Sequence, residues 1–315
     1  MTGQRKKQAD VNPSAPEPVG SDEPIAAAAL ATSGQGTEHA AADPGGTRPG
    51  EPGAAAAAGR VRALLEEMFG RIAPIGAAFA GQRSAFLAAG TELAPDRLSR
   101  VKEIIWRQLG LLPAADGAGV VAAPGVVSGR ERHLEWWQRS AAGDGSADAY
   151  SRIRLNLDPE SIDLYDYLVM DWFTVPQAEG RRYVYGPFID FSGADRSILA
   201  MTIPIFAPVG GNGGNGEAGR ADGESNGRSR YGEFLGVAGA DIRMSQLEPA
   251  LLAILRPLAC PAVLATAERR VIAANTARWI VGTRLDRLPR LGYDGFTDVA
   301  EIGADSGWLL AAARR

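Results

Sequence analysis

"FLGVAGADI", residues 234–242, combines the two features on which the fold prediction depends. Its apolar residues and glycines predict a strand, and near the end of that strand stands the carboxylate of Asp241. The next segment, "MSQLEPALLAILRPL" (244–258), places leucines such as Leu247 and Leu251 on one face of a helix. The sequence therefore predicts a strand that leads past an acid directly into an amphipathic helix.

Further strand patterns lie upstream of this one. "SILAMTIPIF" (197–206) is strand-like, and the Gly- and Asn-rich connection over 209–230 predicts a flexible insertion in a hairpin with 234–242. The glycines of the insertion lack the Lys-Ser/Thr pair and the following helix that a phosphate-binding P-loop needs. "GAGVVAAPGVV" (117–127) predicts a strand and turn, whereas "RERHLEWWQ" (130–138) predicts a short helix or bend.

The N-terminal part of the chain predicts helices. Large apolar residues recur every three or four positions over 60–79, so we expect a long helix there, with a kink at Pro74. "APDRLSRVKEIIWRQLG" (94–110) predicts a second helix, with a proline near its start and a glycine at its end. Residues 1–57 are dominated by Ala, Pro, Gly, Ser and acids, and we expect them to be disordered because they offer little apolar surface to bury.

The C-terminal part predicts a smaller α+β region. "AVLATAERRVIAAN" (262–275) reads as two strands around a polar turn, and "NTARWIVG" (275–282) reads as a short helix. "FTDVAEIG" (296–303) and "SGWLLAAAR" (306–314) predict a final pair of strands. The chain as a whole therefore predicts an α+β protein with antiparallel sheets, without the strand-helix alternation of a Rossmann fold.

Composition excludes several functional classes. The net charge of −4 gives no basic footprint for nucleic acid, and we expect a soluble globular protein. Cys260 is the single cysteine and His39 and His133 are the two histidines, so we predict no disulfide framework, no metal site and no cofactor. The most apolar stretch, 247–266, is interrupted by charges and prolines, so we predict no membrane span; without a recognisable signal peptide, a cytoplasmic location is expected.

"YDYLVMDWF" (165–173) contains four aromatic rings and two acids in nine residues. A buried strand would use aliphatic residues, and a solvated loop would not include a tryptophan, so we interpret the stretch as part of a ligand cage. Simpler roles stay open: the rings as core residues, Asp190 as the cap of a turn, and Asp241 as the cap of the helix that follows it.

Four stretches together resemble the double Cache family of small-molecule sensor domains: "GAGVVAAPG…LEWW", "YDYLVMDWF", "YVYGPFID" with "MTIPIF", and "FLGVAGADI". The resemblance covers residues 60–315 and implies a long N-terminal helix followed by two PAS-like modules with antiparallel sheets, the second reduced. The implied division is a disordered tail (1–57), a helical region (58–116), a distal ligand-binding module (117–257) with the insertion 209–230, and a reduced proximal module (258–315).

The resemblance also implies a pocket in the distal module. It would gather Tyr165, Trp172, Phe173, Tyr185, Phe188, Asp190 and Asp241. Family members that bind α-amino acids commonly carry an arginine where this chain has Met170, and a tyrosine where it has Phe173. Both differences remove groups that bind a ligand carboxylate. The ligand implied is therefore an amine or another nitrogenous, amino-acid-like metabolite.

Two other functional classes stay open from the sequence. The chain could be a protein-interaction module with a collapsed pocket, or a hydrolase in which Asp190 and Asp241 act as acid and base. We expect a sensor rather than an enzyme, with a separate signalling or regulatory protein as its partner. Because the helix over 60–79 carries more large side chains than one sheet needs, we also expect a homodimer paired through that helix.

Overall fold

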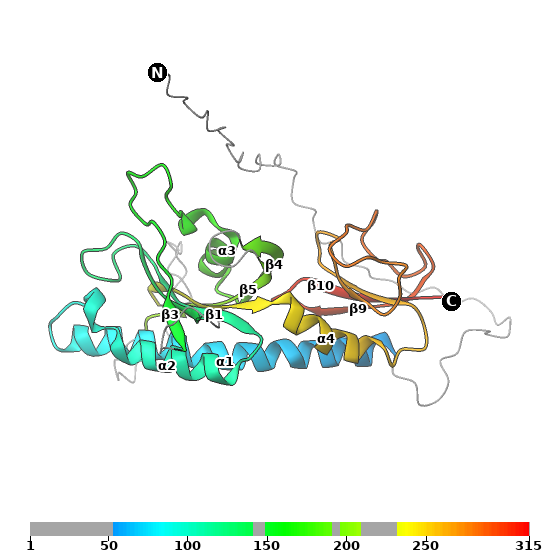
Figure 1. Cartoon of the computed structure of the whole chain (residues 1–315), viewed down its shortest axis with the longest axis horizontal. Helices are drawn as coiled ribbons and strands as arrows, with labels where there is room; N and C mark the ends of the chain where they lie inside the picture. The colour runs from blue at the N-terminus through cyan, green and yellow to red at the C-terminus, as the bar shows by residue number, and fades with distance from the viewer. Residues whose placement is uncertain (1–52, 141–148, 191–195, 209–231, 315) are drawn as a thin grey trace, which may run out of the picture. The chain divides into compact units, whose positions relative to one another are not determined.

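The computed structural model describes residues 53–140, 149–190, 196–208 and 232–314. Figure 1 shows the helices and strands of these segments. The expected disorder of residues 1–57 and of the insertion 209–230 concerns segments that, apart from residues 53–57, lie outside the described residues.

The first element is the long helix α1 (Ala54–Ala88). It begins ahead of the predicted start at residue 60 because the alanines over 54–58 are the strongest helix formers. Pro74 lies inside α1 and does not end it. The second predicted helix is confirmed as α2 (Ser99–Leu111), but Pro95 opens the separate short 3₁₀ helix η1 (Pro95–Arg97) instead of α2 itself.

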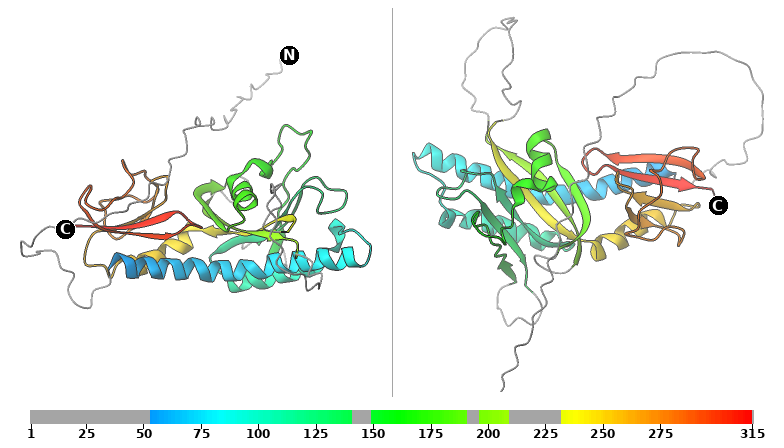
Figure 2. Two further views of the ribbon diagram at one scale, coloured as in Figure 1. Left: turned by 180° about the vertical axis from the view of Figure 1, so that it is seen from behind. Right: turned by 90° about the horizontal axis from the view of Figure 1, so that it is seen from above.

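Six antiparallel strands form the larger sheet, in the order β3-β2-β1-β6-β5-β4. They are β1 (Ala115–Ala122), β2 (His133–Arg139), β3 (Tyr150–Arg152), β4 (Tyr183–Asp190), β5 (Arg196–Phe206) and β6 (Phe234–Arg243). Helices α1 and α2 cover one face, and α3 (Asp171–Glu179) covers the other (Figures 1 and 2). The strands predicted in 117–127, 197–206 and 234–242 are confirmed as β1, β5 and β6.

The prediction of a helix or bend over 130–138 is wrong, because most of this segment is strand β2. Between β1 and β3, β2 pairs its backbone on both edges, and this non-local pairing outweighs the local helix preference. Side chains alternate along a strand, so Trp136 and Trp137 face opposite sides of the sheet. Trp137 meets Trp106 of α2 edge to face, with ring centroids 5.1 Å apart.

The smaller sheet follows α4 (Met244–Leu255) and has the order β8-β7-β10-β9. Its strands are β7 (Ala262–Ala265), β8 (Val271–Ala274), β9 (Phe296–Gly303) and β10 (Trp308–Ala313), as predicted. The helix predicted over 275–282 is absent. Instead, the side-chain oxygen of Asn275 accepts a hydrogen bond from Ala262 N–H at 2.7 Å. The backbone N–H of Gly282 donates to Val271 O at 2.8 Å.

The apolar face of α1 is covered within the chain. Its large residues at positions 61, 65, 68, 69, 72, 75 and 79 are all buried, and α1 packs against strands of both sheets. The apolar side chains of α1 on which the dimer prediction rested are therefore already buried within one chain. The homodimer stays a prediction, and this face of α1 does not support it. No helix of the described segments has the length and apolarity that crossing a bilayer would require.

Candidate ligand-binding site

A small cavity of about 60 Å³ lies on the α3 side of the six-stranded sheet. Its described lining residues are Val121, Leu134, Trp136, Ile153, Leu155, Tyr165, Trp172, Phe188, Ile198 and Asp241. The structure thus brings together Tyr165, Trp172, Phe188 and Asp241 from segments far apart in the sequence. We call this space the aromatic cavity.

The other three residues of the predicted site are Phe173, Tyr185 and Asp190, and none of them is among the described lining residues of the aromatic cavity. Phe173 follows Trp172 on α3, and successive helical residues point in different directions. Its ring is buried at 5.2 Å from Tyr167, away from the cavity. Tyr185 lines a separate space; Phe188 lines both spaces and so separates Tyr185 from the cavity. Asp190 ends β4, and its side chain lies outside the described residues.

Asp241 lies on β6, opposite Gly117 of β1 and Ala200 of β5. It does not cap the following helix, because α4 begins at Met244 and its N-cap residue is Arg243, without a side-chain cap. The alternative role that the sequence left open for Asp241 is therefore excluded. Among the described lining residues, Asp241 is the one that carries a formal charge.

Trp136 forms a wall of the aromatic cavity. It lies on β2, in the segment for which a helix or bend was predicted. Its indole lies over glycines of two neighbouring strands. A Cβ atom at Gly117 would come within 2.6 Å of Trp136 Nε1, and one at Gly239 within 3.3 Å of the ring. A Cβ at Gly119 would lie 2.2 Å from the carbonyl oxygen of Glu135. Glycines inside strands mark such close approaches, so they signalled that a large group packs on this face, but not which side chain it is.

The stretch 165–173 is tied to the sheet by hydrogen bonds. Thr202 Oγ1 donates to the carbonyl oxygen of Trp172 at 2.9 Å. The Tyr167 hydroxyl donates to Ala122 O at 2.8 Å and accepts from His133 N–H at 3.1 Å. Burial raises the pKa of Tyr167, so its hydroxyl stays neutral and keeps its proton for Ala122. These bonds fix the indole of Trp172 at the cavity.

Met170 stands where the resemblance led us to look for an arginine. It precedes α3 as the N-cap residue and is not among the cavity's lining residues. The described lining contains no arginine, lysine or histidine. The described segments also contain no group of three or more His, Cys, Asp or Glu side chains placed to hold a metal ion.

Comparison with known proteins supports the fold. No protein-family model matches the sequence. No curated protein matches it either. Among solved structures, the extracellular domain of the proposed histidine kinase mmHK1S-Z3 is similar, with 14% identity, a TM-score of 0.51, and coverage of 82% of this chain and 91% of that chain. The chain has the double Cache fold.

A second similar structure is the ligand-binding domain of the Campylobacter jejuni chemoreceptor Tlp3 in complex with L-valine. It shares 12% identity and a TM-score of 0.51, over 81% of this chain and 87% of that chain. In the double Cache fold of this chain, α1 is the long N-terminal helix and the two antiparallel sheets follow it, as the α+β prediction required. At such low identity the similarity concerns the fold and does not transfer a ligand.

Proposed function

We propose that the chain is a small-molecule sensor module and that its aromatic cavity binds a small organic cation, such as a methylated amine. The observation that carries the proposal is the chemistry of the cavity: aromatic side chains, one carboxylate, and no cationic side chain among the described lining residues. This chemistry fits a positive charge on the ligand.

The balance of interactions favours an amine over an α-amino acid. A cation on an aromatic face gains about 0.5–2 kcal/mol, and a hydrogen bond from an ammonium group to Asp241 would add about 1.5–3 kcal/mol. A ligand carboxylate would instead meet the like charge of Asp241, and no cationic side chain is among the described lining residues; like charges brought together in a desolvated site repel by several kcal/mol. The similar Tlp3 domain is in complex with L-valine, which carries such a carboxylate.

The size of the cavity restricts the ligand further. A volume of about 60 Å³ is far below that of pockets for drug-sized ligands, which span about 300–1,000 Å³. We therefore propose a cation of few heavy atoms, admitted when the segment 153–157 moves outward. This segment follows β3 and is held by Ile153 N–H donating to Trp136 O at 3.0 Å and by Tyr165 N–H donating to Asn156 O at 2.8 Å.

The alternatives have less support. A hydrolase would need Asp190 and Asp241 as a pair, and of these Asp241 alone is described at the cavity. The two similar structures are the extracellular domain of a proposed histidine kinase and the ligand-binding domain of a chemoreceptor, which favours a sensor module over a hydrolase. The predicted signalling partner stays a prediction. So does the cytoplasmic location, since the similar domain of mmHK1S-Z3 is extracellular.

Calorimetric titration with methylamine, trimethylamine and L-valine tests the proposal. We expect a methylated amine to bind, and Asp241→Asn and Trp172→Ala each to weaken it by about tenfold or more, which corresponds to about 1.4 kcal/mol. Asp171→Asn is the matched control, because Asp171 is an exposed acid beside Trp172 that does not line the cavity. The proposal is wrong if L-valine binds and the amines do not, or if both cavity variants bind like the unchanged chain.

A further inference from the structure

An open groove of about 1080 Å³ lies beside β2 and β3, outside the aromatic cavity. Its charged lining residues are Arg130, Glu131, Arg132, Arg152, Arg154 and Asp158. We call it the arginine groove. It shares Leu134, Ile153 and Leu155 with the aromatic cavity, so these three residues form the partition between the two spaces.

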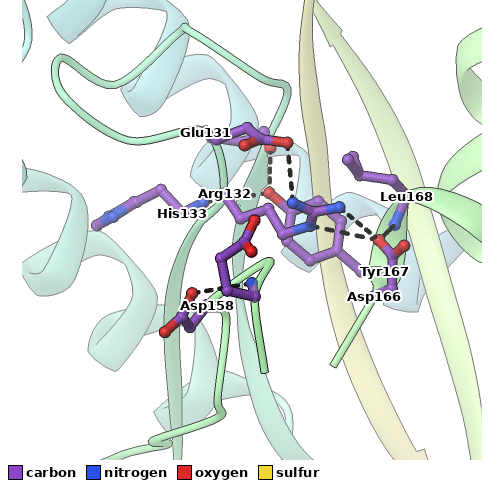
Figure 3. A network of polar contacts seen from close by, with 9 residues as sticks. Glu131, Arg132, His133, Asp158, Asp166, Tyr167 and Leu168 are labelled. Atoms are coloured by element: carbon purple, nitrogen blue, oxygen red, sulfur yellow. Dashed lines mark hydrogen bonds and ion pairs between the residues drawn. The ribbon is translucent and has the colours of Figure 1, made fainter. Parts of the chain in front are cut away.

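Two of the four arginines are held by the protein itself. Arg132 donates to Glu131 at 2.9 Å and to Asp166 at 3.2 Å, and its side chain is 9% exposed. Figure 3 shows its guanidinium group between the two carboxylates. Arg152 binds Glu135 Oε2 at 3.0 Å and Leu134 O at 3.1 Å. These two arginines stabilise the walls of the groove.

The other two arginines are exposed and available. Within the described residues, no acidic side chain pairs with Arg130 or Arg154. The two acids that line the groove already have partners: Glu131 binds Arg132, and Asp158 Oδ1 accepts the backbone N–H of Glu160 at 3.0 Å (Figure 3). In the described residues, Arg130 and Arg154 therefore line the groove outside any ion pair, and Asp158 is the lining acid that is not paired with an arginine, although the chain as a whole is acidic.

A buried histidine faces the same space. The side chain of His133 is 8% exposed and lines the groove, and its Nε2 has no hydrogen-bond partner in the described structure. The nearest carboxylate oxygen, Glu135 Oε2, is 3.9 Å away. Burial lowers the pKa of His133 to about 4, and the charges of Arg152 and Arg130 contribute to this shift. Buried polar atoms rarely stay without a partner, so Nε2, which is shielded from solvent, is an unsatisfied atom directly behind the surface of the groove.

We propose that the arginine groove binds a small polyanion with clustered oxyanions, a polycarboxylate or a phosphate compound. Arg130 and Arg154 form its ion pairs, and the bound anion lies beside His133, where its negative charge acts on the imidazole. Guanidinium groups suit this ligand because their planar N–H donors match carboxylate and phosphate oxygens. The inference does not depend on the amine proposal, since it concerns another space and a ligand of opposite charge.

The test is calorimetric titration of the full chain with citrate and with pyrophosphate at about 0.01 M ionic strength, where the Debye length is about 30 Å. The two ligands distinguish a carboxylate from a phosphate source. We expect saturable binding of at least one, weakened about tenfold or more in Arg130→Gln/Arg154→Gln, or about 1.4 kcal/mol.

The matched control is Arg287→Gln/Arg290→Gln, which removes the same charge from two exposed arginines away from the groove. It should change the dissociation constant by less than about twofold, because only nonspecific attraction is altered. Equal weakening by both double variants, or no saturable binding of either anion, would overturn the proposal. Binding that is seen only with a long polyanion such as heparin would also overturn the proposal.

The pKa of the His133 imidazole supplies an independent measurement of where the anion binds. In a His39→Gln background, the imidazole of His133 is the single histidine signal in a proton NMR titration. The charged groups near the imidazole are Glu135, Arg152 and Arg130. A bound oxyanion stabilises the imidazolium, so the saturating ligand should raise the pKa of His133 above its value of about 4. An unchanged pKa at saturation would contradict the proposed position of the anion.

Discussion

The aromatic cavity and the arginine groove share a partition but differ in size and charge. The cavity has a volume of about 60 Å³ and contains one carboxylate among rings, whereas the groove has about 1080 Å³ and is lined by four arginines. Charged groups are seldom buried unless they are paired, because the protein interior does not replace their hydration. Arg130, Arg152 and Arg154 are exposed to water, Arg132, whose side chain is 9% exposed, is paired with two acids, and half-buried Asp241 is the one acid in the described lining of the cavity.

The partition itself explains how one stretch of chain serves both spaces. After β3 the residues of 152–157 alternate between polar and apolar side chains, in the pattern of an extended segment. Arg152 and Arg154 line the groove alone, whereas Ile153 and Leu155 line both spaces. The outward movement proposed for 153–157 would also displace Arg154, which lies in that segment, so the two proposed ligands should influence each other's binding.

The largest expected effect concerns the glycine floor beneath Trp136. Gly119→Ala places a Cβ atom 2.2 Å from Glu135 O, a clash with backbone that only a shift of the paired strands can relieve. We expect a loss of about 3 kcal/mol in the free energy of unfolding, at the upper end of overpacking effects. Urea unfolding measures it.

Gly70→Ala is the matched control for this substitution. Gly70 lies exposed in α1, and no atom would lie within 4 Å of the added Cβ. Because alanine favours helix, the change should raise the free energy of unfolding by about 0.5–1 kcal/mol. If both substitutions had the same sign, the close approach of Trp136 to the floor of the cavity would be contradicted.

The next effect is the pH dependence of the free energy of unfolding that arises from His133, which lines the arginine groove and not the aromatic cavity. The pKa of His133 falls from 6.5 to about 4 in the folded chain, so between these values the unfolded state binds more protons. Stability is then fully present above pH 6.5 and is lost as the pH falls towards 4, by roughly 3 kcal/mol in total. His133→Gln should remove this part of the pH dependence, and His39→Gln should not. Urea unfolding at a series of pH values measures the difference in slope.

A smaller effect is expected at the hydroxyl that ties 165–173 to the sheet. Tyr167→Phe leaves Ala122 O and His133 N–H without their buried partner, which should lower the free energy of unfolding by about 1–3 kcal/mol. Tyr293→Phe, at a ring that is 62% exposed, should change it by less than about 0.5 kcal/mol. Equal effects at the two positions would mean that the hydroxyl of Tyr167 does not hold the cavity wall.

Local sequence patterns predicted most of the fold. Helical periodicity indicated α1, α2 and α4, and apolar runs indicated β5 and β6. The errors occur where distant pairing decides the structure. β2 is rich in Leu, Glu and Trp and becomes a strand because β1 and β3 lie on both of its edges. Such pairing cannot be read from a window of a few residues.

The aromatic cavity was predicted in part from the sequence, whereas the arginine groove was not. Tyr165, Trp172, Phe188 and Asp241 were named from the resemblance, and the structure places them on one cavity. The role of Trp136 depends on the register of β2 against the glycines of β1, which the sequence alone does not specify. The arginine groove was not predicted, because its arginines lie in two segments that only the β2–β3 pairing brings together.

The central claim is that the two spaces bind ligands of opposite charge, and one crossed titration tests it. Trimethylamine and citrate are each titrated into the unchanged chain, Asp241→Asn, and Arg130→Gln/Arg154→Gln. We predict that Asp241→Asn weakens the amine about tenfold or more and changes citrate by less than about threefold, while the arginine variant does the reverse. If either variant weakens both ligands equally, or if neither ligand distinguishes the variants, the account of two separate sites of opposite charge is contradicted.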